Sequence, residues 1–329
     1  MRSQVVFLKE ADKLPDALLH FKVFKGFRNR KVLVKLHMGE VRNRYYVKPD
    51  FVKLVVEELL KINAKPFLFD TTVAYNSPRK SKKGYEIVAR LHGFTKKKIG
   101  CPVVIGENGV PIDIKGMVVE VAKEIVDTDC ILAISHIKGH IQAGFGGAIK
   151  NFGMGGVTKE TKKLIHSFCE PVYDPENCTL CGICATVCPF GAISVTDIWR
   201  RNERKCLGCG KCVEACPNNA LSYKKMSLQE ALALSCKACI ENKKVIYVNV
   251  LKDIARSCDC DPSAGPIICP DIGYLVGDDP VAIDKASLDL VDKVEKNIFE
   301  RINRVDPLKQ ILYAKKIGLG SDEYELVKI

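Results

Sequence analysis

The chain has 329 residues, of which 47% are hydrophobic and 27% are charged. This length exceeds what one hydrophobic core needs, and the composition excludes a disordered or low-complexity chain. No apolar run approaches the roughly 18–20 residues that cross a bilayer, and the N-terminal region lacks the apolar core of a secretory signal. We therefore expect no membrane contact and a cytoplasmic location.

Positive charge is concentrated in the first third of the chain. Residues 1–100 carry 23 Lys and Arg against 9 Asp and Glu, whereas the whole chain has a net charge of +12. Such asymmetry is found in proteins that bind nucleic acid, that dock an acidic partner or that expose a solvated Lys-rich surface. Because these residues are scattered along predicted helices and strands without interleaved aromatic residues, we do not favour nucleic-acid binding.

Short apolar strands alternate with amphipathic helices in the first 150 residues and again after about residue 225. The helix predicted over 49–62 has proline in its first turn, and a shorter helix is predicted over 84–91. This alternation predicts an α/β fold, with a mostly parallel sheet and helices on both faces. The predicted strands are 4–8, 31–36, 66–69, 102–105, 117–121, 130–135, 244–251 and 324–329, and the later helices are 227–240, 279–294 and 306–317.

A cysteine-dense segment interrupts the α/β pattern. Of the sixteen cysteines, only Cys101 and Cys130 precede residue 169. Because a cytosolic chain keeps its thiols reduced, metal or redox chemistry is expected here and a disulfide framework is not. We predict a first part of the α/β domain over 1–169, a small ferredoxin-like α+β insertion over 170–225, and the second part of the α/β domain over 226–329.

The insertion contains the motif Cys-x2-Cys-x2-Cys-x3-Cys-Pro twice, with a glycine in each loop (Gly182 and Gly210). Three closely spaced thiolates hold one [4Fe–4S] cluster, and the fourth serves the other cluster. Zinc sites use two cysteine pairs with a longer spacer, so this spacing favours iron–sulfur clusters. The segment resembles bacterial-type two-cluster ferredoxins. The predicted ligands are Cys178, Cys181, Cys184 and Cys216 for the first cluster and Cys206, Cys209, Cys212 and Cys188 for the second.

Several strings outside the repeat are similar to a known family. They are KVLVKLHMGE (31–40), PFLFDTTVAY (66–75), GHIQAGFGGAIKNFGMGG (139–156), CDC (258–260) and PDIGYLVGDDPVAIDKASLD (270–289). Together they resemble the domain-of-unknown-function family 362, many of whose members are iron–sulfur proteins fused to a ferredoxin segment. The resemblance extends over nearly the whole chain. It implies a cluster-carrying protein and supplies no substrate.

A glycine-rich run follows the predicted strand that ends at residue 135. Gly144, Gly146 and Gly147 precede Lys150, but Ile149 replaces the third glycine of the dinucleotide-binding fingerprint. Glycines at a strand-to-helix turn expose backbone N–H groups, and Lys150 adds a cation, so a bound anion or cofactor is one interpretation. The other is a tight turn packed against the sheet.

Two histidines precede this run and are candidates for acid–base catalysis together with the lysine. His136, His140 and Lys150 form the candidate catalytic set. A metal site on the two histidines is not favoured, because the residues between them suggest a loop and not a helix. His37 and His166 are weaker candidates, and structurally hydrogen-bonded histidines remain the alternative throughout.

Acidic residues complete the candidate site. Asp70 ends a predicted strand, which is where α/β proteins place ligand-binding residues. Asp271 belongs to an acidic string with Asp279 and Asp284, of which Asp279 is alternatively a helix N-cap before proline. We expect Asp70, Lys150 and Asp271 to approach one another in a cleft and to contribute to cofactor or substrate binding.

Further cysteines outside the repeat suggest a third metal site. Cys236-x2-Cys239 and Cys258-x-Cys260 together offer four thiolates for zinc or a third cluster. The alternative is that these side chains are buried or free thiols, because a cysteine often behaves as a small apolar residue.

The interpretation that covers these observations best is an iron–sulfur protein that transfers single electrons between a redox partner protein and a site on the α/β domain. Whether the chain is an enzyme is left open. One alternative is a reductase that acts on a small anionic substrate in an α/β cleft, which would require a closed polar pocket beside a cluster. A second alternative is a nucleic-acid-binding protein in which the clusters act as sensors, which would require contiguous basic residues on one face.

Overall fold

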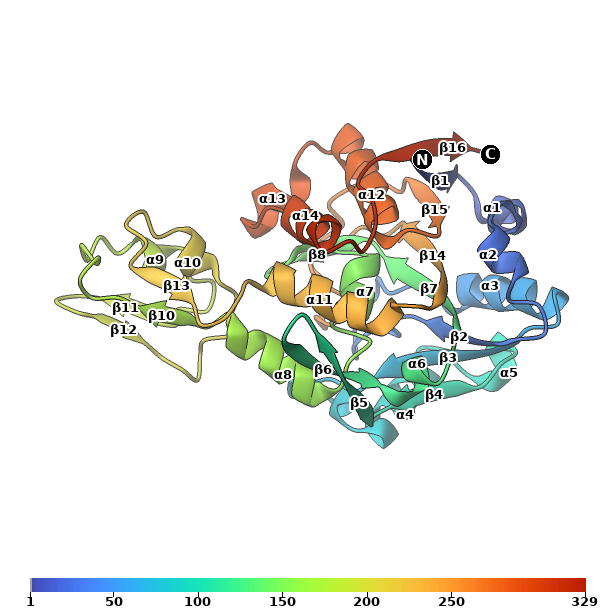
Figure 1. Cartoon of the computed structure of the whole chain (residues 1–329), viewed down its shortest axis with the longest axis horizontal. Coiled ribbons are helices and arrows are strands. Elements are labelled where there is room, and N and C mark those ends of the chain that lie inside the picture. Colours follow the sequence, from blue (N-terminus) through green and yellow to red (C-terminus); the bar gives the residue numbers. More distant parts are fainter. Residues whose placement is uncertain (1) are drawn as a thin grey trace.

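An eight-stranded sheet forms the centre of the molecule (Figure 1). The structure is a computed structural model that describes residues 2–329. Across the sheet the strands follow the order β16, β1, β15, β14, β7, β2, β3, β4. Their bounds are β1 Ser3–Leu8, β2 Lys31–Lys35, β3 Lys65–Thr71, β4 Val103–Gly106, β7 Cys130–His136, β14 Lys244–Leu251, β15 Gly273–Gly277 and β16 Tyr324–Lys328.

All strands of this sheet except β15 run in the same direction, which confirms the predicted mostly parallel sheet. Strand β7 lies between β14 and β2, and all its residues are buried. Its side chains alternate between two cores: Ile131 and Ala133 face one, and Leu132 and Ile134 face the other. A strand that is covered on both faces is expected to read as a continuous apolar run, as β7 does.

Helices cover both faces of the sheet, as predicted, and each group of helices shares a core with one face. None of the helices within residues 2–329 combines the length and hydrophobicity needed to span a bilayer. The helices of one face are α7 Ala148–Gly153, α11 Leu228–Ile240, α12 Pro280–Val294 and α14 Leu308–Lys316, and those of the other are α1 Leu14–His20, α2 Lys22–Lys25, α3 Pro49–Lys61 and α4 Lys82–Leu91.

The segment predicted as a strand over 117–121 does not join the large sheet. It forms β6 (Met117–Ala122), which pairs with β5 (Gly109–Ile114) in a separate antiparallel hairpin. Lys115 and Gly116 form the turn, with φ of 52° and 79°. Two successive residues with positive φ make the tight hairpin turn that suits strand twist. The sequence did not reveal this hairpin, because Lys-Gly is a weaker turn signal than Asn-Gly.

Short elements complete the fold and shape the region around the central strands. A small hairpin of β8 and β9 follows β7 directly. Their bounds and those of the remaining helices are β8 Lys138–His140, β9 Gly144–Gly146, α5 Lys96–Ile99, α6 Lys123–Val126, α8 Lys159–Phe168 and α13 Ile298–Asn303.

The cysteine-dense segment projects to one side of the molecule, away from the large sheet (Figure 1). Its first strand, β10 (Pro171–Tyr173), pairs with its last, β13 (Leu221–Tyr223), so the chain enters and leaves side by side. This pairing explains how a segment can project from the α/β part without dividing the sheet. It supports the domain boundaries that we propose, 1–169, 170–225 and 226–329. The segment also contains β11 Ile193–Val195, β12 Trp199–Arg201, α9 Ile183–Thr186 and α10 Lys211–Glu214.

Candidate functional site

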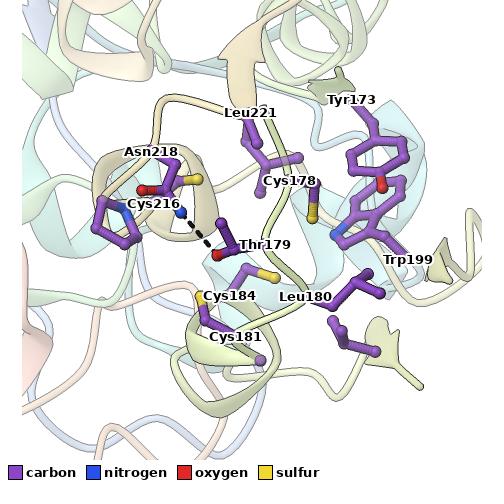
Figure 2. A pocket seen from close by; sticks show the side chains of 14 residues that line it. Tyr173, Cys178, Thr179, Leu180, Cys181, Cys184, Trp199, Cys216, Asn218 and Leu221 are labelled. Carbon is purple, nitrogen blue, oxygen red and sulfur yellow. Dashed lines mark hydrogen bonds between the residues drawn. The ribbon is translucent and has the colours of Figure 1, made fainter. Parts of the chain in front are cut away.

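Four cysteine side chains surround one small pocket in the projecting segment (Figure 2). Cys178, Cys181 and Cys184 come from the first cysteine loop, and Cys216 comes from the second. These four residues are the predicted ligands of the first cluster. A thiol of the second repeat unit thus reaches a pocket formed mainly by the first unit, which is the arrangement that shared ligation of this cluster requires.

The lining of this pocket suits a group that accepts hydrogen bonds. The indole nitrogen of Trp199 is buried and has no hydrogen-bond partner among residues 2–329. It faces Cys184, whose pKa is raised by burial in spite of the nearby indole N–H. The Trp199 ring stacks on Tyr173 with 4.6 Å between the ring centroids, and Asn218 donates a 2.8 Å hydrogen bond to Thr179 across the pocket (Figure 2). Cluster sulfur atoms accept hydrogen bonds of the kind that Trp199 can donate.

Glycine is required where each cysteine loop enters its helix. Gly182 and Gly210 precede α9 and α10 with φ of 75° and 76°. This left-handed conformation disfavours any residue with a Cβ atom. At Gly210 a Cβ atom would also approach the Tyr223 ring to 2.5 Å. The turn places the third cysteine of each loop, Cys184 or Cys212, within the first turn of a short helix.

The second predicted set of thiols also lies close together. Burial raises the pKa of Cys212 to about 12, and the neighbouring thiols of Cys209, Cys206 and Cys188 add to this shift. Cys188 belongs to the first loop, so this set again draws on both repeat units. Arg201 Nη1 lies 3.9 Å from Cys206 Sγ, where its charge would stabilise a thiolate. Because cluster irons bind thiolates, loading this set would release protons.

A cavity of about 620 Å³ lies where the projecting segment meets the α/β part. Lys35, Asp70 and His136, at the carboxyl ends of β2, β3 and β7, line one side, and Cys206 and Leu207 line the other. Open α/β sheets bind ligands at the carboxyl ends of their strands, and this volume is typical of a small-molecule site. Its basic and imidazole lining residues are Lys35, His37, Arg79, His136, Lys138, His140, Lys150, Lys162, Lys163 and His166.

Asp70 pairs with several cations at the base of the cavity. Lys35 Nζ donates a 2.8 Å hydrogen bond to Asp70 Oδ1, the Tyr85 hydroxyl donates to Oδ2, and Arg79 Nη2 lies 3.7 Å from Oδ2. Burial opposes ionisation of Asp70, but Lys35, His37 and Arg79 outweigh it and hold the pKa of Asp70 well below its ordinary value. Asp70 is therefore a carboxylate that orders the surrounding cations.

The amino group of Lys162 is only partly protonated at neutral pH. Its Nζ donates hydrogen bonds to Thr71 Oγ1 and to the carbonyl of Thr72. Burial lowers the pKa of Lys162 to about 7, an effect that Asp70 opposes and Lys35 reinforces. The cavity therefore becomes more positive as the pH falls through neutrality.

This lysine should make the stability of the protein depend on pH. The pKa of Lys162 is about 7 in the folded chain against 10.5 for an ordinary lysine. Between these values the unfolded chain binds one proton more, so the free energy of unfolding rises with pH. From about pH 6.5 to about pH 8.5 we expect a rise of about 2 kcal/mol relative to the Lys162→Met variant, measured by chemical denaturation. Lys163→Met, at an exposed position of the same helix, should respond as the wild type does, and an unchanged response in Lys162→Met would refute the assignment.

The Cys-Asp-Cys tripeptide between β14 and β15 lies against the same cavity. Asp259 Oδ1 lies 2.7 Å from His136 Nδ1, and Oδ2 lies 3.2 Å from Lys138 Nζ. Burial opposes ionisation of Asp259, but His136 and Lys138 keep its pKa well below the ordinary value. Cys258 and Cys260 line the cavity. The buried aspartate thus anchors the turn while its two neighbours present thiols to the cavity.

Of the candidate histidines, His136 and His140 both line the cavity, but their rings are held differently. His136 is fixed at both nitrogens, because its Nε2 lies 2.9 Å from the carbonyl of Lys252. His140 accepts hydrogen bonds at Nδ1 from the backbone N–H groups of Gln142 and Ala143, at 3.2 and 3.0 Å. His136 is therefore a structurally held histidine, and His140 retains one ring nitrogen for other partners.

Lys150, the third candidate catalytic residue, lies beside the thiol pair. Its Nζ is 3.7 Å from Cys258 Sγ. A hydrogen bond from the Cys260 thiol lowers the pKa of Cys258 well below its ordinary value; burial opposes this shift and Lys150 reinforces it. Burial disfavours the charge of Lys150, but Cys258 and Cys260 outweigh it and raise the pKa of Lys150. The cation and the thiolate therefore stabilise each other.

The glycine-rich run does not offer its N–H groups to a ligand. The first two N–H groups of α7 donate to the buried carboxylate of Asp284 at 2.7 and 2.9 Å. Burial raises the pKa of Asp284 to about 6 in spite of these bonds. A Cβ atom at Gly147 would approach Asp284 to 2.3 Å, and one at Gly144 would approach Pro307 to 2.9 Å. The anion that we expected at this run is therefore a side chain of the protein, although Gly146 and Gly147 do line the cavity.

The remaining candidates separate into two groups. His37 and His166 line the cavity. Asp271 is not one of its lining residues, and its Oδ1 accepts a 2.8 Å hydrogen bond from the N–H of Asp253. The expectation that Asp271 lies with Asp70 and Lys150 is thus not met, because Asp271 instead caps the loop after β14. Asp279 accepts hydrogen bonds from the first N–H groups of α12 and is the helix cap that its sequence context suggests.

The structure does not bring the four cysteines of the predicted third site together. Cys236 and Cys239 are buried on α11, where Cys239 Sγ lies 3.8 Å from the carbonyl of Phe152 in α7. Burial raises the pKa of Cys239 to about 12. Neither residue lines the cavity that Cys258 and Cys260 face. Among residues 2–329, the donor atoms of His140, Cys258 and Cys260 lie within 4.8 Å of one another instead, and every cysteine is a free thiol.

The cavity residues that were not among the sequence candidates include Lys35, Arg79 and Lys162. Lys35 carried a usable signal, because it ends an apolar strand and is paired in register with Phe69, next to Asp70. A lysine at that point of a buried parallel strand needs a partner. Arg79 lies in a short 3-10 helix (Pro78–Lys80) and Lys162 lies in α8, and basic residues are common in such elements, so no local pattern singled them out.

Comparisons with known proteins place the chain in a family without naming a reaction. No curated protein matches it. The apoprotein structure of lactate racemase from Thermoanaerobacterium thermosaccharolyticum is 16% identical with a TM-score of 0.48, over 90% of this chain and 58% of that one. A crystal structure of a Thermotoga maritima protein is 11% identical with a TM-score of 0.43, over 90% of this chain and 59% of that one. This chain thus spans less than two thirds of either protein. The family model described as Domain of unknown function (DUF362) matches residues 32–289, so the chain belongs to this family.

Proposed function

We propose that this chain is an iron–sulfur protein that binds two [4Fe–4S] clusters and transfers single electrons to a small anionic substrate in the α/β cavity. One observation carries the proposal: Cys206, a predicted ligand of the second cluster, forms part of the cavity wall. The bound clusters would supply one-electron redox chemistry. An electron on the second cluster would then be separated from the cavity by little more than one cysteine side chain.

The positions of the two cysteine sets support a relay with an outer and an inner end. Cys181 of the first set is exposed, and the pocket of that set lies in the projecting segment (Figure 1). Cys212 of the second set is buried. The first cluster would therefore receive electrons from an external redox partner protein, and the second would pass them to the cavity. This order of clusters belongs to our proposal.

Charge in the cavity supports the choice of an anionic substrate. Six basic residues line it against two acidic ones, Asp70 and Glu170. Asp70 is already paired with Lys35 and Arg79. The lysines nearer the thiol pair, such as Lys150, retain charge for a ligand. A carboxylate that enters a cavity with this charge balance exchanges its hydration water for fixed cations. This exchange is favourable where the cavity excludes bulk water.

An enzyme explains this geometry better than a simple electron carrier does. A carrier needs only exposed clusters and a flat docking face, whereas a cavity lined by several buried charged side chains next to a predicted cluster ligand suits a reaction. We therefore propose an oxidoreductase, with the reductase direction favoured by the cationic cavity. Buried cations also account for part of the basic first third, because Lys35 and Arg79 are both 1% exposed.

The test uses anaerobically purified protein and malonate as a small dianionic probe. We expect about eight irons and about eight sulfides per chain, and two overlapping EPR signals after reduction with dithionite. Malonate should shift the signal of the cluster bound by Cys206 and leave the other unchanged. The Lys150→Gln variant should need about tenfold more malonate for the same shift, a loss of about 1.4 kcal/mol. Lys53→Gln, on the exposed face of α3, is the matched control.

Two outcomes would overturn the proposed function. Zinc in place of iron would remove the redox basis altogether. The other outcome is iron at the expected level with neither EPR signal sensitive to malonate at any concentration tested. It would show that the clusters do not respond to the cavity, and the chain would then be an electron carrier.

A further inference from the structure

Two thiols face the cavity from opposite ends of a rigid tripeptide. Cys258 and Cys260 line the cavity, while Asp259 between them is buried and bound to His136 and Lys138. The backbone N–H of Cys260 lies 3.5 Å from Cys258 Sγ. The Sγ atoms of Cys258 and Cys260 lie within 4.8 Å of each other. Two thiols at this separation are within reach of a disulfide after a small side-chain rotation.

Lys150 provides the cation that thiol–disulfide chemistry needs. Its Nζ lies 3.7 Å from Cys258 Sγ, and the residue lies in the cavity wall. The thiolate is the nucleophile in disulfide exchange and also the form in which a sulfur leaves. A buried thiolate without a cation would be costly. The pair is therefore asymmetric, with Cys258 as the attacking sulfur and Cys260 as the resolving one.

The main rival is a metal ion bound by the two thiols and His140, because their donor atoms lie within 4.8 Å of one another. Nδ1 of His140 is already an acceptor for the N–H groups of Gln142 and Ala143. A neutral imidazole that accepts at Nδ1 carries its proton on Nε2. Neither ring nitrogen then offers a free lone pair, and His140 is better suited to donate a hydrogen bond to a sulfur atom. The rival site would have to break these two backbone bonds.

We propose that Cys258 and Cys260 are a redox-active dithiol–disulfide pair that reduces an anionic disulfide in the cavity and is itself reduced through the second cluster. This inference rests on the proposed function for its supply of electrons. It names a substrate class that the proposed function leaves open.

The exchange steps balance without any further oxidant. The Cys258 thiolate attacks one sulfur of the substrate disulfide, forms a mixed disulfide and releases the first substrate thiolate, which takes a proton. Cys260 then loses its proton and attacks Cys258, which breaks the mixed bond and releases the second substrate thiol. The products are two substrate thiols and a Cys258–Cys260 disulfide.

Regeneration of the dithiol requires two electrons and two protons. The two clusters that the eight cysteines would hold could supply one electron each, which together are the two electrons that the disulfide needs. The S–S bond breaks as these electrons enter, Cys258 is released beside Lys150, and water supplies the protons. The proposed route crosses one cavity, because Cys206 lies in the wall of the cavity that Cys258 and Cys260 also line.

The test is thiol labelling and mass spectrometry, with dithiodiglycolate, a disulfide that carries two carboxylates, as the probe. After anaerobic exposure and alkylation, the tryptic peptide 257–285 of the wild type should carry label on Cys269 only. Its mass should be two hydrogen atoms below that of the same singly labelled peptide with free thiols at Cys258 and Cys260. Cys260→Ser should instead retain half of the probe as a mixed disulfide on Cys258. In the same samples Cys236 and Cys239 should stay fully labelled, as matched buried controls.

The electron route is tested by adding dithionite with methyl viologen to the oxidised protein. The wild type should regain label on Cys258 and Cys260, and Cys216→Ala, which lacks the first cluster only, should do so as well. Cys206→Ala and Cys188→Ala should stay oxidised at the pair while keeping the EPR signal of the first cluster. Equal reduction in all four proteins would refute the route through the second cluster.

Two further results would overturn the inference without touching the proposed function. One is full labelling of Cys258 and Cys260 in oxidised wild-type protein that holds about eight irons with both EPR signals. The other is an additional tightly bound metal ion that is lost in both Cys258→Ser and His140→Ala. Absence of iron, in contrast, would refute the proposed function whatever the labelling shows.

Discussion

Replacing Cys216 by alanine should remove the first cluster and leave the second, although Cys216 belongs to the second cysteine loop. The reason is that Cys216 lines the pocket formed by Cys178, Cys181 and Cys184. Iron should fall from about eight to about four per chain, and one of the two EPR signals of the reduced protein should disappear. No other cysteine within residues 2–329 lies in this pocket, so none can replace the lost Cys216 thiolate as a ligand of the first cluster.

The pattern of residual spectra distinguishes shared ligation from a separate cluster in each loop. Cys178→Ala should leave the same residual spectrum as Cys216→Ala, and Cys188→Ala should leave the same spectrum as Cys206→Ala. Cys169→Ala is the matched control, because the Cys169 thiol donates to the carbonyl of Ile165 and belongs to neither set. If Cys216→Ala instead matched Cys206→Ala, each loop would hold its own cluster.

Asp70→Ala should be strongly destabilising. This carboxylate is 2% exposed and contacts Lys35, Arg79 and Tyr85. Removing one partner of a buried ion pair leaves charge that is neither paired nor hydrated, at a cost of roughly 3–5 kcal/mol. We expect the midpoint of thermal unfolding, followed by circular dichroism under anaerobic conditions, to fall by roughly 5 °C.

Two comparisons separate the ion-pair effect from the loss of a side chain. Asp129→Ala removes an exposed carboxylate 4.0 Å from Lys243, and such a pair contributes at most about 1 kcal/mol. The double variant Asp70→Ala/Lys35→Met removes both charges and should recover part of the lost stability. A single Asp70→Ala variant as stable as Asp129→Ala would show that the cations of the cavity do not depend on this carboxylate.

The cavity has a positive balance because a carboxylate in its wall, Asp70, and a buried one next to it, Asp259, are both used for structure. Asp70 pairs with Lys35 and Arg79, Asp259 with His136 and Lys138, and both carboxylates are buried. Burial of charge is tolerated only with such partners. The cations that remain, Lys150 above all, then face an anionic ligand or a thiolate. Structural ion pairs and the proposed chemistry thus use the same set of side chains.

Several features could be predicted from the residues alone because the interactions behind them are local. The apolar run of β7 identifies a strand that is buried on both faces, and Pro49 with the spaced valines of α3 identifies a helix. The cysteine spacing, with a glycine in each loop, is also local, since both turns need a left-handed residue. The duplicated motif predicts shared ligation, which is why the four cysteines around the first pocket could be named in advance.

Other features depend on where distant segments meet, and local patterns carry no information about that. The sequence could not tell that Asp284 would accept the N–H groups of α7, that Asp271 would lie outside the cavity, or that Cys236 and Cys239 would be buried on another helix.

What the amino-acid sequence by itself determined is the α/β alternation and the two sets of cysteines, because strand burial and cluster ligation depend on spacing within a few residues. Only the tertiary structure decided that Lys35, Lys150 and Cys258 share a cavity with Cys206. The physical reason is that the free energy of pairing the Lys150 cation with the Cys258 thiol is gained only when segments 108 residues apart in the chain are brought together by the fold.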